Sequence, residues 1–399
     1  MTRANPRPRA PIPAGGGRLP IDLAPALSLA GLVIIAAVTF ALLGGSLPVL
    51  PGGPGGPIRS PTPSNVIIVD PRADVPGSLL YAKHGNIWLQ EGNTARQLTS
   101  TGQDSMPAWA PDGASIYFVR TTPESGRWPS GGVTRTYNLA VPRLMRVGAD
   151  GTGEPEVLLT GRVERGTNSW SYFIREPAIS PDGATAAIVT DGPDPTTSEI
   201  VVKLLDLAGG VLTNPRLGQT QALGHQDPAW SPDGRFLLYV QNAREGARGM
   251  PAIYRYNPQN QRSIAITGPG YADPSWSRDG RFIAATRTST FGTDVVILDA
   301  ADGAEVVRIT RDENSFSPVW SPAGNAIAFF RVQHGVVDLM LVPLEGTGPD
   351  WTAGEAISLT ISAGLDAASR AAWFIPADQL PPLPTPTPAP SVAGASSTP

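Results

Sequence analysis

The chain has 399 residues, with 30 Lys and Arg against 34 Asp and Glu, which gives a formal net charge of −4 at pH 7. This balance excludes the basic field that a nucleic-acid partner requires. The chain contains no cysteine, which excludes disulfides, a thiolate nucleophile and metal sites built on cysteine. The length allows one large all-β domain to occupy most of the chain.

Two segments precede the expected folded region. Residues 1–20 carry four arginines and no acidic residue, which predicts a disordered basic tail. Residues 23–43 are uncharged and mostly apolar. A helix of that length spans about 30 Å, the thickness of a hydrocarbon core. We therefore expect a transmembrane helix within residues 21–45.

The length and the flanking charges of this apolar run predict its topology. The run is longer than the usual apolar core of a cleaved signal peptide, so we expect an uncleaved anchor. Cleavage near residues 44–46 is the alternative. Because the arginines precede the run, the positive-inside rule places the tail in the cytoplasm and the rest of the chain outside it. The sequence thus predicts a single-pass protein of the cell membrane with an extracytoplasmic domain.

Pro-rich stretches border the folded region on both sides. Residues 46–65 are rich in Pro and Gly and predict a linker that is partly polyproline-like and partly flexible. Residues 379–399 are rich in Pro, Ser and Thr and predict a disordered tail. The folded domain is therefore expected over residues 66–378.

One short motif recurs throughout this region. In Trp230-Ser231-Pro232-Asp233-Gly234 a strand ends at the Trp and a tight turn follows, because Pro fixes φ, Asp bonds nearby backbone and Gly accepts positive φ. An apolar run that fits a buried strand comes next. A turn and strand repeated at roughly 45 to 50 residues indicate stacked β units, usually a propeller. The positions equivalent to Trp230 are Trp109, Ile179, Trp276, Trp320 and Trp373.

The two ends of the folded region complete each other. Each full repeat reads as four strands, the number in a propeller blade. Residues 78–99 read as the last three strands of a blade, whereas residues 369–375 read as a first strand with no blade after it. We therefore predict an all-β, six-bladed propeller whose C-terminal strand closes the N-terminal blade. Closure of this kind removes the exposed sheet edges.

The repeat resembles a known family. The stretch 228–235, Pro-Ala-Trp-Ser-Pro-Asp-Gly-Arg, is followed by an apolar strand, an Ile-Tyr strand and a strand of the type x-Leu-Thr. This pattern resembles the WD-like repeat of TolB-type six-bladed β-propellers. The third and sixth blades depart from it, with Ile179 in place of Trp and Ala323 in place of Asp. The resemblance implies the fold, but propellers of this type serve as scaffolds, as sensor ectodomains and as parts of peptidases.

Insertions in one blade provide a first candidate binding site. Residues 121–140 and 161–174 exceed the normal repeat, and we expect them to form loops on the binding face. Arginine and aromatic side chains on loops are typical anchors of protein interfaces. Packing of these side chains onto their own blade is the alternative. The candidates are Arg127, Trp128, Trp170 and Tyr172, with Phe173 beside them.

The central channel provides a second candidate site. The residue just before each motif Pro occupies the same place in every inner strand, so these residues are expected to form a ring near one channel mouth. Glu176, Asp227 and Asp273 supply three carboxylates, and Arg370 supplies one positive charge. Such a ring can bind a cation or a basic peptide group; a solvated channel lining is the alternative. The two remaining positions are Met106 and Ser317.

The sequence contains no catalytic or metal-binding set. The motif aspartates, Asp112, Asp182, Asp233 and Asp279, are expected to cap their turns. The histidines have no metal-ligand spacing, and neither a nucleophile elbow nor a phosphate-binding Gly loop occurs. We therefore predict no enzymatic activity, no cofactor and no metal.

The predicted anchor, linker and closed propeller favour a membrane-anchored extracytoplasmic scaffold that binds a protein or a peptide. One alternative is a lyase or hydrolase in the channel mouth that uses Glu176, Asp227 or Asp273 as acid–base groups. Another is the ectodomain of an anchored sensor.

Overall fold

The computed structural model describes residues 67–68, 74–194, 199–217, 224–242, 250–346 and 350–383. Their regular secondary structure is β, apart from a short 3-10 turn at Ala377–Gln379. No helix in this part of the chain is long and apolar enough to span a membrane. The predicted basic tail, transmembrane helix and linker all lie outside the described residues, as does the C-terminal tail beyond residue 383.

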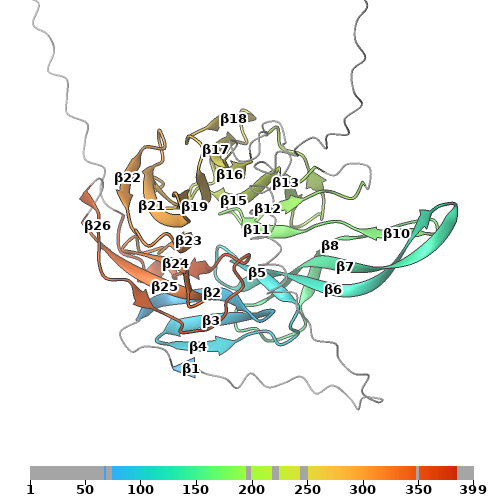
Figure 1. The fold of residues 1–399 in the computed structure, drawn as a ribbon, viewed down its shortest axis with the longest axis horizontal. Helices are drawn as coiled ribbons and strands as arrows, with labels where there is room; N and C mark the ends of the chain where they lie inside the picture. Colours follow the sequence, from blue (N-terminus) through green and yellow to red (C-terminus); the bar gives the residue numbers. More distant parts are fainter. Residues whose placement is uncertain are drawn as a thin grey trace, which may run out of the picture. The chain divides into compact units, whose positions relative to one another are not determined.

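The described strands form six antiparallel sheets, which are arranged as the blades of a ring (Figure 1). We number the blades from the N-terminus. Blade 1 contains β1 (Ile67–Ile68), β2 (Val75–Lys83), β3 (Asn86–Gly92), β4 (Thr94–Gln97) and β28 (Ala372–Phe374). Blade 2 contains β5 (Asp104–Trp109), β6 (Ser115–Ser130), β7 (Val133–Gly148) and β8 (Glu156–Thr160), with the added hairpin β9 (Arg162–Arg165) and β10 (Asn168–Ser171).

The other four blades follow in chain order. Blade 3 contains β11 (Arg175–Ile179), β12 (Thr185–Thr190), β13 (Val201–Asp206) and β14 (Leu212–Thr213). Blade 4 contains β15 (His225–Trp230), β16 (Leu237–Gln241), β17 (Ala252–Asn257) and β18 (Arg262–Ala265). Blade 5 contains β19 (Tyr271–Trp276), β20 (Phe282–Thr288), β21 (Thr293–Asp299) and β22 (Glu305–Arg308). Blade 6 contains β23 (Ser315–Trp320), β24 (Ala326–Gln333), β25 (Val336–Glu345), β26 (Thr352–Ala353) and β27 (Ile357–Ser358).

The hydrophobic core lies between neighbouring blades. Leu238 and Val240 of blade 4, for example, pack in one cluster with Ile283 and Val296 of blade 5, and all four are fully buried. Burial of such a side chain stabilises the fold by roughly 1.5–3 kcal/mol. Because both faces of a blade meet a neighbour, the second strands are apolar at consecutive positions, as the sequence of β16 shows.

The motif tryptophans link successive blades through hydrogen bonds as well as packing. The indole Nε1 of Trp230 donates to the carbonyl of Ala178 at 3.2 Å, and that of Trp276 donates to Ala229 at 3.1 Å. Trp109 donates in the same way to Ala372 at 3.1 Å. In each case the acceptor is the residue directly before the one that occupies the motif Trp position in the previous blade. The prediction that the motif Trp packs within or between blades is confirmed.

The motif aspartates cap their turns, as predicted. The carboxylate of Asp233 accepts from the Ser231 hydroxyl at 2.6 Å and from the backbone N–H of Arg235 at 3.0 Å. The glycine that follows has a positive φ, 70° at Gly113. A Cβ at Gly113 would lie 2.2 Å from the ring of Phe374. Glycine is therefore required there both by conformation and by space.

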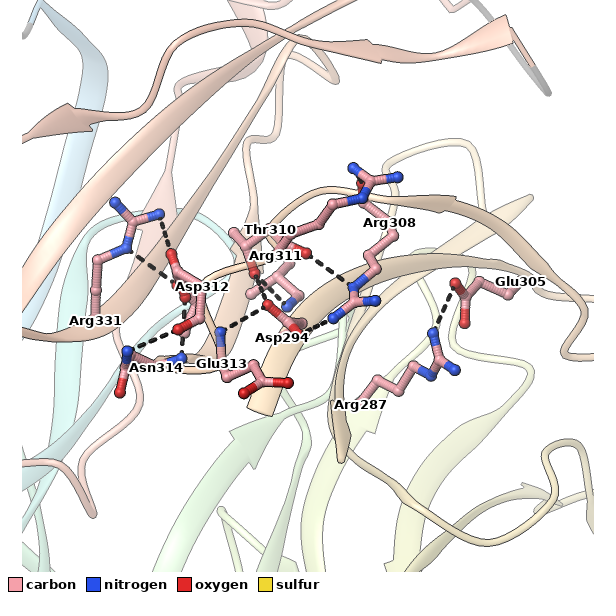
Figure 2. Close-up of polar contacts among 12 residues, drawn as sticks. Arg287, Asp294, Glu305, Arg308, Thr310, Arg311, Asp312, Glu313, Asn314 and Arg331 are labelled. Carbon is pink, nitrogen blue, oxygen red and sulfur yellow. Dashed lines mark hydrogen bonds and ion pairs between the residues drawn. The ribbon is translucent and has the colours of Figure 1, made fainter. Parts of the chain in front are cut away.

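A threonine at the end of the fourth strand ties that strand to the third. The hydroxyl of Thr310 accepts from the N–H of Val295 at 2.9 Å, and Thr99, Thr267 and Thr360 accept equivalent bonds in their blades. In blade 5 the same hydroxyl donates to Asp294, which also accepts from Arg308 and from the backbone of Glu313 (Figure 2). The hydrogen bond from the third strand thus explains the Thr of the x-Leu-Thr pattern.

The ring closes as predicted. β28 pairs antiparallel with β2, with Leu79 opposite Trp373 and Leu80 opposite Ala372. Trp373 donates its indole N–H to the carbonyl of Pro76 at 2.8 Å. A strand from the C-terminus therefore completes the N-terminal blade, so that each of the six described blades has an inner strand.

One expectation about conformation is wrong, and the contacts of the domain continue beyond its expected end. The insertion at residues 121–140 is not a loop: β6 and β7 continue as a fully paired hairpin from Ser115 to Gly148, which extends well beyond the ring (Figure 1). The ordered C-terminal region also passes residue 378. Leu380 packs against the core cluster of blades 1 and 6, and the carbonyl of Pro381 accepts a hydrogen bond from Arg278.

We predict that closure is essential for cooperative folding. Truncation before Ser369 removes β28, opens the ring and exposes the apolar face of blade 1, so the protein should aggregate and lose its cooperative thermal transition. Truncation after Leu383 keeps every contact described above and should melt as the full chain does. Equal melting of the two truncated proteins in differential scanning calorimetry would show that closure by β28 is dispensable.

Candidate functional site

Each of five inner strands carries a non-glycine residue in the left-handed conformation, directly before a proline. The φ angles are 52° at Met106, 53° at Glu176, 53° at Asp227, 49° at Asp273 and 48° at Ser317. At each of these places the register between the first and second strands of the blade shifts, as in a β-bulge. Such backbone costs about 1–3 kcal/mol and persists only where its surroundings fix it.

Hydrogen bonds between blades provide that support. The N–H of Asp227 donates to Glu176 Oε2 at 2.7 Å, and the N–H of Asp273 donates to Asp227 Oδ2 at 3.2 Å. In the same direction around the ring, Glu176 donates its N–H to Met106 Sδ at 3.2 Å. We call the five left-handed residues, together with the side chains that accept hydrogen bonds from their N–H groups, the inner ring. It places the predicted carboxylates side by side around the channel, and those of Glu176 and Asp227 each accept a hydrogen bond from the next blade.

Two further residues, which the repeat pattern does not predict, complete the inner ring. Ser369 Oγ accepts from the N–H of Met106 at 3.0 Å. Thr286 Oγ1 accepts from the N–H of Ser317 at 2.9 Å and donates to Asp273 Oδ2 at 2.6 Å. A signal for Thr286 was present, because a hydroxyl stands where the equivalent second-strand positions are apolar. Those positions are Val119, Val189, Val240 and Phe330.

Arg370 departs from the pattern of its equivalents. It precedes Ala371 instead of a proline, and its side chain reaches from blade 1 to blades 4 and 5. Its Nη1 donates to the carbonyl of Pro274 at 3.1 Å. Its Nη2 lies 3.8 Å from Asp273 Oδ1 and 4.0 Å from Asp227 Oδ1. Those distances exceed a hydrogen bond, and Nη2 is buried without a hydrogen-bond partner in the described structure.

These side chains line a cavity of about 620 Å³ along the channel, together with the prolines and tryptophans of the inner strands. Burial raises the pKa of Asp227 well above its usual range, and the charges of Asp273 and Glu176 raise it further, whereas Arg370 opposes the shift. The side chain of Asp227 is 16% exposed. The cavity thus has a carboxyl group that holds a proton more tightly than an ordinary aspartate does.

The unused hydrogen-bonding atoms define what the cavity can bind. Asp227 Oδ1 and Asp273 Oδ1 accept no hydrogen bond within the described residues, and Glu176 Oε1 has only Arg175 at 3.6 Å. Arg370 Nη2 requires an acceptor, while the carboxylate oxygens require donors. A group that offers both, such as a peptide with a positively charged side chain, fits this arrangement. No group of three His, Asp or Glu side chains in the described ranges is arranged to hold a metal ion.

The second predicted site lies on the β6–β7 hairpin and its neighbour β9–β10, which we call the arm. The rings of Trp128 and Trp170 meet edge to face with centroids 5.4 Å apart. Trp170 also donates its indole N–H to the carbonyl of Pro193 at 3.1 Å. Trp128 is 37% exposed, and Arg127 is exposed beside it.

The other two aromatic residues of this insertion have different environments. Tyr172 is buried in the core of blades 2 and 3, and its hydroxyl donates to the carbonyl of Thr160 at 2.8 Å. It is therefore a packing residue and does not lie on the exposed surface of the arm. Phe173 is 54% exposed. The channel and the arm are separate surfaces. The structure brings together the charged candidates in the channel, and Trp128 with Trp170 on the arm, but not Tyr172.

We predict opposite pH dependences for two aspartate variants. Folding raises the pKa of Asp227, so the folded protein binds this proton more tightly than the unfolded chain does. The resulting contribution to the free energy of unfolding is fully present below the unfolded pKa of about 3.9, and it is lost as pH rises through the folded pKa. Asp227→Asn should therefore raise the melting temperature at pH 7, by about 2 °C or more, and lose that advantage near pH 4.

The matched control is Asp182→Asn in a motif turn. Hydrogen bonds from the Ser180 hydroxyl and the Ala184 N–H lower the pKa of Asp182, so its contribution is present above about pH 3.9 and lost as pH falls. This variant should melt lower than the parent at pH 7 and approach it in acid. A lower melting temperature for Asp227→Asn at pH 7 would contradict the assigned electrostatics.

Comparisons with known proteins agree with this fold. Residues 156–350 match the family model described as the TolB beta propeller domain. A search of curated proteins finds no match. The crystal structure of TolB from Acinetobacter baumannii is similar with a TM-score of 0.53 and 19% identity, over 74% of this chain and 66% of that one. The chain thus spans slightly less than two thirds of that relative.

Two further structures have TM-scores of 0.50. A putative TolB from Agrobacterium tumefaciens is 20% identical over 71% of this chain and 88% of that one. A chain of a nidogen/laminin complex is 11% identical over 74% of this chain and 97% of that one. At these identities the likeness establishes the fold alone. Repeat motif, blade order, family match and structural likeness together show that the described domain is a TolB-like six-bladed β-propeller.

Proposed function

We propose that the protein is a membrane-anchored extracytoplasmic scaffold that binds a protein or peptide partner in the mouth of its central channel. The anchor in this proposal is the apolar run at residues 23–43, and the orientation follows from the arginines before it. The propeller supplies the binding surface.

One observation carries the proposal. Arg370 Nη2 is buried without a hydrogen bond, and it lies between two carboxylate oxygens that accept none. Buried polar groups normally find partners, so this arrangement needs a ligand or water to complete it. A peptide carbonyl can accept from Arg370 while a Lys or Arg side chain, or an amino terminus, donates to Asp227 and Asp273.

The titration of Asp227 suits such a ligand. A cation entering the cavity offsets the repulsion among the three carboxylates, so Asp227 can release its proton as the ligand binds. The affinity for a cationic peptide should therefore increase with pH until Asp227 ionises in the free protein.

The similar structures support a binding role in general terms. Two of them are named TolB or putative TolB, and a third comes from a complex of nidogen with laminin. Their likeness is one of fold, so the identity of a partner has to come from the site of this chain.

An enzyme in the channel mouth is the second candidate, because a carboxyl group with a raised pKa beside two further carboxylates is also typical of acid–base catalysis. The two functions differ in their outcome. A scaffold leaves a bound peptide intact on prolonged incubation, whereas an enzyme converts it, which mass spectrometry of the recovered peptide detects.

The peptide-binding prediction can be tested with the purified full chain in detergent. We expect Gly-Gly-Arg-Gly-Gly to bind measurably in calorimetry, and the peptides with Gln or Glu in the central position to bind at least about tenfold more weakly. Asp273→Asn should reduce the affinity for the Arg peptide about tenfold, equivalent to about 1.4 kcal/mol. Asp302→Asn changes an exposed turn residue and is the control. Equal affinity for all three peptides would exclude the channel as a site for a basic group.

The membrane topology can be tested separately, because the chain lacks cysteine. We expect a single cysteine at Ser60 to react with a membrane-impermeant maleimide in intact spheroplasts. A single cysteine at Ala4 should react only after lysis. Labelling of the Ala4 position alone in intact spheroplasts would reverse the proposed orientation.

A further inference from the structure

The arm is a second exposed surface of the described domain, and its outer part carries arginines without acidic residues. The family match begins at residue 156, so the β6–β7 hairpin lies outside it. The hairpin from residue 125 to residue 138 contains two arginines and no acidic residue, on a chain with a net charge of −4. It therefore forms a local positive region on an acidic protein.

The register of the sheet gathers aromatic and basic side chains on one face of the arm. Trp128 is directly opposite Arg135, and side chains of directly paired strand residues lie on the same face. Tyr137 and Val133 are two positions on either side of Arg135, so they share that face. Tyr137 is 41% exposed and Val133 is 61% exposed. This face of the arm is thus apolar and positively charged at once.

The face continues onto the second hairpin. Trp170 of β10 meets Trp128 edge to face, and the guanidinium of Arg165 in β9 lies 5.9 Å from the Trp170 ring centroid. The result is a row in the order Arg165, Trp170, Trp128, Arg135, which crosses from one hairpin to the other. We call this row the arm stripe.

The arginines of the arm are free to pair with a ligand. Arg135 and Arg165 are exposed, and neither forms an ion pair within the described part of the chain; the same holds for Arg127 on the adjacent strand position. The base of the arm differs, because Glu124 is paired there with Arg143 and Arg162. Internal pairing therefore fixes the base of the arm and leaves its outer arginines uncompensated.

The two tryptophans of the stripe are held by specific contacts. Trp170 is fixed by its hydrogen bond to Pro193 and by its contact with Trp128. A rigid aromatic surface loses little conformational entropy on binding, which is why Trp, Tyr and Arg dominate the energetics of protein interfaces. The stripe has that composition, and contacts restrain its two tryptophans.

We propose that the arm stripe is a docking surface for an acidic segment of a partner protein. This deepens the proposed function, since it takes the propeller to be a binding scaffold, but it uses a surface separate from the channel. Carboxylates of the partner would pair with Arg135 and Arg165, and apolar side chains would pack on Trp128, Trp170 and Tyr137.

The position of the aromatic residues favours a protein over a lipid surface. The tip of the arm is Ser130-Gly131-Gly132-Val133, which offers a single apolar side chain for insertion into a bilayer. The tryptophans and Tyr137 lie on the broad face of the sheet instead, where an extended segment can lie along them. We therefore treat binding to an anionic membrane as an outcome that would overturn the proposal.

The test uses the full chain in detergent and three fluorescent 12-residue peptides of identical apolar composition, whose alternate positions are Glu, Gln or Lys. We expect saturable binding of the Glu peptide, at least tenfold tighter than that of the Gln peptide, and no binding of the Lys peptide in anisotropy measurements. Trp128→Ala, which keeps every charge, and Arg135→Ala should each weaken binding of the Glu peptide at least fivefold.

Controls separate this surface from other effects. Arg262→Ala removes an exposed arginine of blade 4 that forms no ion pair in the described structure, and it should leave binding unchanged. Asp273→Asn should also leave it unchanged, so failure of the channel site and failure of the arm site are distinguishable. Both arm variants should melt within about 2 °C of the parent, because neither side chain belongs to a hydrophobic core cluster of the blades.

Three outcomes would overturn the proposal. The first is equal binding of the Glu and Gln peptides. The second is unchanged binding of the Glu peptide by Trp128→Ala, which would show that the peptide is bound by charge attraction alone. The third is arm-dependent flotation with vesicles of phosphatidylcholine and phosphatidylglycerol in the absence of binding to the Glu peptide, which would assign the stripe to a lipid surface. Flotation compares the parent with Arg135→Ala. Both are prepared as an anchor-free chain whose melting transition matches that of the full chain.

Discussion

The bulge that five of the six inner strands share determines how the blades of this propeller are joined. A left-handed residue before a proline turns a backbone N–H out of the sheet ladder, and that donor then needs an acceptor in a place that water reaches poorly. The acceptor comes from the preceding blade, as Glu176 serves Asp227 and Asp227 serves Asp273. The requirement links neighbouring blades around the channel, and the bond from the N–H of Met106 to Ser369 ties the C-terminal segment to blade 2. The same requirement explains why polar side chains occupy the wall of the channel.

The inner ring also connects stability with binding. Each acidic residue uses one oxygen as an acceptor within the ring and keeps the other for the cavity. Arg370 compensates part of the resulting negative charge from the opposite side of the channel, because it reaches Pro274 and approaches Asp273. The compensation is incomplete, since Asp227 still has a raised pKa. The site thus combines a carboxyl group whose pKa is raised with a guanidinium nitrogen that makes no hydrogen bond. A ligand that brings a positive charge to the carboxylates and a hydrogen-bond acceptor to Arg370 would stabilise it.

Much of this architecture follows from the sequence. The repeat at Trp230, the closure through Trp373 and the inner-ring position of Asp227 and Asp273 could all be predicted, because each depends on a short local pattern repeated in register. Thr286 and Ser369 could not be found in the same way, since their role depends on contacts between blades. The arm was misjudged for a different reason: its polar, Gly-containing sequence resembles a loop, but pairing over the whole of β6 and β7 makes it a hairpin. Tyr172 was placed on a surface because spacing alone does not show which face of an insertion is covered.

The most direct measurement of the central claim is the titration of the Asp227 carboxyl group by carbon-13 NMR, with labelled aspartate and with Asp227→Asn for assignment. The channel described here predicts a pKa well above the ordinary value of about 3.9, which decreases when a peptide containing arginine is added. An ordinary pKa in the free protein that does not change with the peptide would contradict the proposed site, because Asp227 would then experience neither burial nor its neighbours' charge.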